Sequence, residues 1–102
     1  MSTSPYDDVC EKTETQVVIS PTYQVIFHND DYTTFDFVIK ALMDIFHKSR
    51  ETAEEITLTI HNNGKGIVGI YSEQVAYAKM DETMDLAKAF QQDHFIVTVE
   101  SV

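Results

Sequence analysis

Residues 23–46 read YQVIFHNDDYTTFDFVIKALMDIF, and this stretch decides the fold class. Its first six residues are rich in β-branched and aromatic types, which predicts a strand over 23–28 that the polar triplet at 29–31 ends. Thr33 followed three residues later by Asp36 resembles a capping box and predicts a helix start. Apolar residues then recur at helical spacing, namely Phe35, Val38, Ile39, Leu42 and Phe46. The stretch therefore predicts a strand, a short polar loop and an amphipathic helix.

A second helix is expected directly after the first. Ser49 is a suitable N-cap, Glu51 places a negative charge in the first turn, and Asn-Asn-Gly at 62–64 is a stop signal. The middle of this segment is ambiguous, because residues 55–60 alternate like a strand and yet fit a helical face. We favour a helix, whose shared face would contain Ala53, Ile56, Thr57 and Ile60.

The remaining sequence predicts two strands with a helix between them. The short apolar run at 67–71 is typical of a buried strand, and residues 95–99 predict a last strand. Ser72 can cap a long helix whose apolar stripe would contain Ala76, Met80, Thr83, Ala87 and Phe90. The order strand, helix, helix, strand, helix, strand fits an α+β sandwich with helices over one face of a small sheet.

The chain of 102 residues has room for one small domain. Residues 1–21 are rich in Ser, Thr, Asp and Glu and contain both prolines, so we expect a flexible N-terminal arm there and the folded domain at 22–102. Apolar residues make up 43% of the chain, without a run near the roughly 20 residues of a membrane span. This pattern indicates a soluble protein.

Charge and cysteine content limit the partners further. The chain has 7 basic and 17 acidic residues and a formal net charge of −10, which disfavours nucleic acid and anionic membranes and suits cationic groups. Cys10 is the single cysteine and cannot form an internal disulfide, and the N-terminus does not resemble a secretion signal, so we expect a cytoplasmic protein. The scattered histidines lack zinc-site spacing, and we expect neither a metal nor a cofactor.

Two apparent ligand motifs are not supported by their context. Residues 64–69 match G-x-G-x-x-G, but these glycines precede and enter a strand, whereas a dinucleotide fingerprint follows a strand and opens a helix. We expect them instead to allow a positive-φ turn and a close approach of neighbouring elements. Asn29, Asp31 and Thr33 imitate the first ligands of a calcium loop, but the required glycine and distal glutamate are absent.

The triplet Asn29-Asp30-Asp31 and His61 are the strongest candidates for chemistry. Asp30 or Asp31 with His61 could act as an acid–base pair, but a nucleophile elbow and a phosphate loop are missing, and Cys10 lies far from any candidate base. The triplet could instead cap the helix and pin its own loop through side-chain hydrogen bonds to the backbone. From the residues alone this structural role is the simpler interpretation.

Two motifs with matching separation resemble the ClpS family. They are NDDYT at 29–33 and IHxxGKGxxGxY at 60–71, followed by Ala76 and Lys79, and the resemblance covers about residues 22–100. ClpS is the bacterial adaptor that delivers N-degron substrates to the Clp AAA+ protease. The resemblance implies a βααβαβ domain with three helices on a three-stranded antiparallel sheet. It also favours the helical interpretation of residues 55–60.

The resemblance implies binding of a substrate's first residue, which would be Leu, Phe, Tyr or Trp, without catalysis. By the family pattern Asn29, Asp31 and His61 contact the substrate's α-amino group, with Asp30 beside them. The side-chain pocket would be walled by Thr33, Phe35, Val38, Thr57, Ile60 and Phe95. The family's partner is the N-terminal domain of a ClpA-like or ClpC-like AAA+ ATPase, and its N-terminal arm helps to engage the protease.

The chain departs from the family pattern at several positions. Thr33-Thr34-Phe35 replaces the usual Thr-Pro-Met, and Thr57 replaces a pocket methionine, so we expect relaxed rejection of Ile or Val as first residues, with Phe35 refilling part of the space. Lys79 matches a docking position, whereas Gln74 and Tyr77 stand where acidic residues are common. Two alternatives therefore remain: a divergent module with altered first-residue preference or docking partner, and a small Asp/His acid–base enzyme.

Overall fold

The computed structural model describes residues 21–102, which form three strands and three helices. The α+β class, the element order and the antiparallel sheet agree with the prediction, which is confirmed. The predicted arm at 1–21, apart from Pro21, lies outside the described residues, as does Cys10. The elements are β1 (Tyr23–His28), α1 (Phe35–Asp44), α2 (Arg50–Asn63), β2 (Lys65–Tyr71), α3 (Glu73–Ala89) and β3 (Ile96–Ser101).

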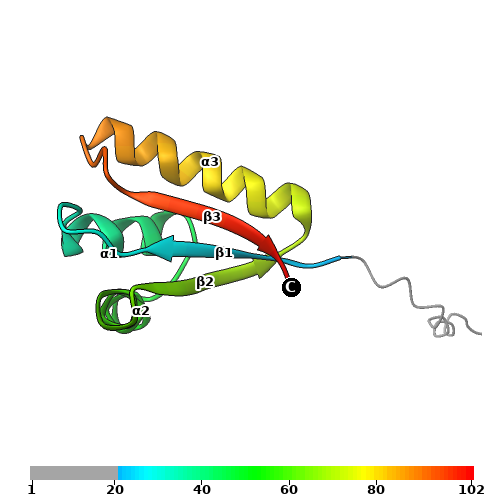
Figure 1. The fold of residues 1–102 in the computed structure, drawn as a ribbon, viewed down its shortest axis with the longest axis horizontal. Coiled ribbons are helices and arrows are strands. Elements are labelled where there is room, and N and C mark those ends of the chain that lie inside the picture. The colour runs from blue at the N-terminus through cyan, green and yellow to red at the C-terminus, as the bar shows by residue number, and fades with distance from the viewer. Residues whose placement is uncertain (1–20) are drawn as a thin grey trace, which may run out of the picture.

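β1 is the central strand of the sheet. The strand order is β2-β1-β3, and both neighbours run antiparallel to β1 (Figure 1). Val25 pairs with Gly69 and Ile26 with Ile67, so Val68 is an extra residue in β2. Such a bulge bends its strand and turns the extra side chain. Val68 is buried in the core.

The helices cover one face of the sheet. α3 contacts all three strands and α2 contacts β2, and Figure 1 shows α3 extending along β3. On the helix-facing side, the ring of Phe27 packs edge-to-face against Phe46 and Phe95, with centroids 5.4 and 4.9 Å away. Phe95 in turn packs against Phe37 at 5.4 Å. Aromatic pairs prefer this geometry, so four rings form the centre of the core.

The N-terminus of α1 lies one residue later than predicted. Thr34, not Thr33, is the N-cap, and its Oγ1 accepts a hydrogen bond from Phe37 N at 3.2 Å. The side chain of Thr33 is oriented toward the preceding loop instead, where its hydroxyl, like its N–H, donates to the carboxylate of Asp30. The capping-box interpretation of Thr33 and Asp36 is therefore wrong.

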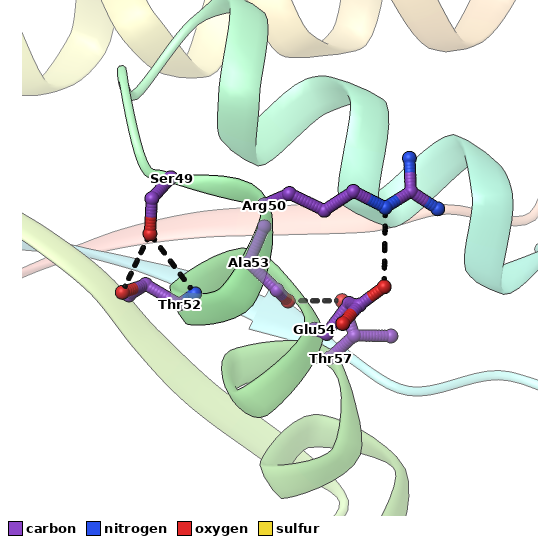
Figure 2. Close-up of polar contacts among 6 residues, drawn as sticks. All are labelled: Ser49, Arg50, Thr52, Ala53, Glu54 and Thr57. Atoms are coloured by element: carbon purple, nitrogen blue, oxygen red, sulfur yellow. Dashed lines mark hydrogen bonds and ion pairs between the residues drawn. The ribbon is translucent and has the colours of Figure 1, made fainter.

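Residues 55–60 are helical and lie inside α2. Ser49 caps this helix as predicted and accepts a hydrogen bond from Thr52 N at 3.2 Å (Figure 2). Figure 2 also shows Thr57 Oγ1 bound to the carbonyl oxygen of Ala53, one turn earlier, at 2.7 Å. Ala53, Thr57 and Ile60 are buried, which is the spacing of one helix face rather than the alternation of a strand. Gly64 ends the helix at φ 89°.

Strand boundaries differ from the predicted ones by a few residues. β2 begins at Lys65 rather than residue 67, because Lys65 pairs with His28 at the end of β1. β3 runs over Ile96–Ser101 rather than 95–99, because Ser101 pairs with Tyr23 at the other end. The length of β1 thus sets the ends of both partner strands.

The predicted apolar stripe of α3 ends earlier than expected, since Phe90 is 48% exposed. No helix within residues 21–102 is long and apolar enough to cross a membrane.

Candidate functional site

A small cavity lies where the β1–α1 loop, α1, α2 and the start of β3 meet. Its volume is about 10 Å³, which is the space of roughly one water molecule. The lining contains all six residues predicted to wall the side-chain pocket, together with three from the end of β1 and the loop: His28, Asn29, Asp30, Thr33, Phe35, Val38, Thr57, Ile60 and Phe95. Three segments distant in sequence, 28–38, 57–60 and Phe95, therefore contribute to one hollow.

The apolar walls of this cavity differ in their freedom to move. Val38, Ile60 and Phe95 are at most 5% exposed and are held by the core. Phe35, at the start of α1, is 44% exposed. Its ring packs edge-to-face on the imidazole of His61 with centroids 5.2 Å apart. Phe35 is therefore the wall that can be displaced without disturbing the core.

The predicted polar residues lie at or beside the cavity. Asn29 and Asp30 line it, whereas Asp31 and His61 are exposed and lie outside the lining. Asn29 N donates to the carbonyl oxygen of Gly64 at 2.9 Å, which attaches the β1–α1 loop to the end of the helix that carries His61. The backbone thus joins the segments that carry Asn29 and His61, and Phe35 lies against His61.

Asp30 organises its own loop. Its Oδ1 accepts hydrogen bonds from Tyr32 N at 2.8 Å and Thr33 N at 2.7 Å, and its Oδ2 accepts one from Thr33 Oγ1 at 2.6 Å. Partial burial raises the pKa of Asp30, but these hydrogen bonds and the nearby His94 outweigh it and hold the pKa below its ordinary value of 3.8. Asp30 therefore has the loop-pinning role that the sequence left open.

The three predicted docking residues do not share one exposed surface. Lys79 of α3 points into the fold, where its Nζ donates to the carbonyl oxygen of Ile45 at 2.8 Å and lies 5.7 Å from the ring centroid of Phe46. Gln74 and Tyr77 are exposed on the first two turns of the same helix. A larger cavity of about 540 Å³ lies beside Lys79, between the end of α1 and α3.

His28 was not among the predicted site residues, but it lines the cavity. Its Nε2 is 2.8 Å from Thr98 Oγ1 on the neighbouring strand. Its position directly before Asn29, at the end of β1, is the signal that could have identified it. Among residues 21–102, no group of three His, Cys, Asp or Glu side chains is placed to hold a metal ion.

Comparisons with known proteins agree on one family. The family model for the ATP-dependent Clp protease adaptor protein ClpS matches residues 19–95. The ClpS adapter protein of Campylobacter jejuni strain RM1221 is 53% identical over 66 residues, which are 65% of this chain and 69% of that protein. The ClpS adapter protein of Desulforapulum autotrophicum is 46% identical over 77 residues, which are 76% of this chain and 74% of that protein.

A solved structure shows the same fold. Agrobacterium tumefaciens ClpS2, bound to L-phenylalaninamide, superposes with a TM-score of 0.78 at 30% sequence identity, covering 82% of this chain and 100% of that chain. Sequence motifs, element order, family model and relatives agree, and the chain belongs to the ClpS family of ATP-dependent Clp protease adaptor proteins.

Proposed function

We propose that this protein binds the free N-terminal amine and the bulky apolar first residue of N-degron substrates, and delivers them to a Clp AAA+ protease. The observation that carries the proposal is the cavity itself, in which Val38, Ile60 and Phe95 form an apolar wall beside the polar groups of Asn29 and Asp30. L-phenylalaninamide, the ligand of the Agrobacterium relative, has the free amine, apolar side chain and amide of such a first residue.

Elementary energetics support recognition of the amine and the side chain together. A free α-amino group titrates near pH 8 and is mostly cationic at neutral pH, whereas an internal peptide nitrogen or an acetylated terminus is not. Hydrogen bonds to a charged group contribute about 1.5–3 kcal/mol each, and burial of a large apolar side chain contributes a similar amount. After the entropy of association, a micromolar dissociation constant is expected.

Substrate entry requires the cavity to enlarge. A volume of about 10 Å³ is too small for a Leu or Phe side chain. Phe35 is the exposed wall, so outward rotation of its ring opens the pocket while Val38 and Ile60 stay in the core. Because the ring also contacts His61, its movement changes the surroundings of an imidazole that is proposed to contact the amine.

Titration of the full chain with a short fluorescent peptide that begins with Phe tests the proposal. The matched control is the same peptide with an acetylated N-terminus. We expect the acetylated peptide to bind roughly 10- to 100-fold more weakly, because it cannot form charge-assisted hydrogen bonds. Equal affinity for the two peptides would contradict the amine site and revive the alternative of an acid–base enzyme.

Thr57 is expected to influence which first residues are accepted. Its side chain is shorter than methionine and lines the cavity, which leaves room near the β-carbon of the substrate. The change Thr57→Met should increase the preference for Leu over Ile peptides by roughly threefold or more, within the range that one or two methylenes allow. Phe35→Ala enlarges the same cavity from the other side and should reduce the preference for Leu over Ile peptides. An unchanged Leu/Ile ratio in Thr57→Met would remove this explanation.

The proposed partner is the N-terminal domain of a ClpA-like or ClpC-like ATPase. Gln74 and Tyr77 are exposed on α3 and available for a protein contact. A pull-down of the ATPase subunit by the full chain, with Gln74→Ala and Tyr77→Ala as test variants, examines this surface. Loss of capture with unchanged peptide binding would support docking there, and full capture by the double variant would contradict it.

A further inference from the structure

Two loops that are far apart in sequence are joined at the rim of the cavity. We name residues 29–34, between β1 and α1, the amine loop, and residues 90–95, between α3 and β3, the clasp loop. Thr34 N of the amine loop donates to Gln92 Oε1 of the clasp loop at 3.1 Å. The ring of Tyr32 stacks on the imidazole of His94, with centroids 4.2 Å apart and planes 28° from parallel.

The clasp loop is itself held in a defined conformation. Gln92 Nε2 donates to the carbonyl oxygen of Phe90 at 3.1 Å, which orients its Oε1 toward the amine loop. Gln92 N donates to the carbonyl oxygen of Ala87 at the end of α3, at 2.8 Å. Phe95, the last residue of the loop, is buried in the core and lines the cavity. These contacts fix the conformation of the clasp loop, which can therefore hold the amine loop in place.

The amine loop depends on such contacts because its tip lacks burial. Tyr32 is 70% exposed even though its ring is stacked, and Asp31 beside it is exposed. The loop is attached at its start by the Asn29–Gly64 backbone hydrogen bond and internally by Asp30. At its far end Thr34 caps α1, and the contacts to Gln92 and His94 add an attachment to a segment distant in sequence.

We propose that Gln92 and His94 are positioning residues, which hold the amine loop in the conformation that presents Asn29 and Asp31 to the substrate's α-amino group. Each side chain contacts the amine loop directly and lies outside the cavity lining, so the role we assign to both is action through the loop. This inference rests on the proposed function. It assigns a role in binding to a loop that sequence reasoning left unassigned apart from Phe95.

Peptide binding by the full chain tests the inference. His94→Ala removes the stacking and should weaken binding of the Phe peptide by about three- to tenfold, the range that an aromatic pair supports. His94→Phe keeps a stacking ring and should restore the affinity to within about twofold of the parent. Gln92→Ala should also weaken binding, because it removes the acceptor of Thr34 N. His47→Asn, which removes an exposed imidazole elsewhere, is the control and should bind like the parent.

Amide hydrogen exchange provides a readout that does not depend on the peptide. In His94→Ala the amides of Tyr32 and Thr33, which donate to Asp30, should exchange faster, while those of β1 and α3 keep their protection. His94→Phe should return the exchange to the parent rate. Because His94 is exposed, the thermal midpoint should change little.

The two proposals fail in different ways. Parent-like affinity and parent-like exchange in both His94→Ala and Gln92→Ala would overturn the positioning role. Absence of peptide binding by the parent would overturn the proposed function, and the exchange rates of Tyr32 and Thr33 would then decide whether the clasp loop holds the amine loop. Weaker binding in His94→Phe equal to that in His94→Ala would also count against stacking as the cause.

Discussion

At the scale of single residues, Asp30 shows how one carboxylate shapes a binding loop. Its two oxygens accept three hydrogen bonds from Tyr32 and Thr33, so the chain turns back toward α1 immediately after β1. Asp31 keeps its side chain exposed beside it. The adjacent aspartates therefore have different environments: Asp30 holds the loop, and Asp31 is exposed.

The lowered pKa of Asp30 predicts a pH effect on stability. The group contributes its stabilisation fully above its ordinary pKa of 3.8 and loses it as the pH falls through the lower value of the folded state. The free energy of unfolding should therefore fall more steeply between about pH 5 and pH 3 in the parent than in Asp30→Asn. Urea denaturation at several pH values measures the two slopes.

Asp93→Asn is the matched control, because it removes an exposed carboxylate from the neighbouring loop. Its pH dependence should follow that of the parent. Identical slopes in Asp30→Asn and the parent would show that the hydrogen bonds of Asp30 do not stabilise the folded state.

At the scale of elements, Lys79 joins two helices. The last turn of α1 has no basic residue of its own, and Lys79 from α3 donates to the carbonyl oxygen of Ile45 at that end. A cation beside a helix C-terminus interacts favourably with the helix dipole, and a charge-assisted hydrogen bond adds to this. Lys79 therefore stabilises the packing of α1 against α3, whatever its contribution to docking.

Lys79→Met should lower the free energy of unfolding by about 1–2 kcal/mol, because it keeps the aliphatic stem and removes the ammonium. Lys88→Met removes an exposed cation from the last turn of the same helix, which interacts with the helix dipole without a hydrogen bond to another helix, and should lower stability by about 0.3–1 kcal/mol. Urea denaturation compares the two variants, and equal effects would contradict the capping role.

At the scale of the whole molecule, the folded domain contains the complete cavity. Its lining residues lie between His28 and Phe95, and Thr22 already participates in the fold, since its carbonyl oxygen accepts a hydrogen bond from Val102 N at 3.0 Å. Substrate selection and substrate delivery can therefore reside in separate parts of the chain. The first would belong to 22–102 and the second would also need residues 1–21.

A variant that begins at Thr22 tests this division. It should bind the Phe peptide with the affinity of the full chain, because none of the cavity is removed. It should fail to support degradation of a substrate with an N-terminal Phe by the partner ATPase and its peptidase. Degradation at the rate of the full chain would contradict a role for the arm, and lost peptide binding would show that the arm completes the site.

Local signals in the sequence determined the elements and most of their ends. Ser49, Ser72 and Gly64 act on backbone groups within the next or preceding turn, so their roles as caps and stop were predicted and are observed. The residues of the cavity wall were identified through the family resemblance, and the structure places all six around one hollow. The cap of α1 was predicted one residue too early, at Thr33 instead of Thr34, because the sequence does not show that the hydroxyl of Thr33 is oriented toward Asp30.

Taken by itself, the sequence determined the order of the elements, and its resemblance to one family predicted every residue that lines the cavity except His28. The tertiary structure alone decided that Lys79 reaches Ile45, that Gln92 reaches Thr34, that Tyr32 stacks on His94, and that the cavity is nearly closed beside Phe35. Caps and periodicity act between residues within a few positions of each other. Contacts between residues 34 or 58 positions apart depend instead on how the packed core places two loops or helices, and no local pattern encodes that placement.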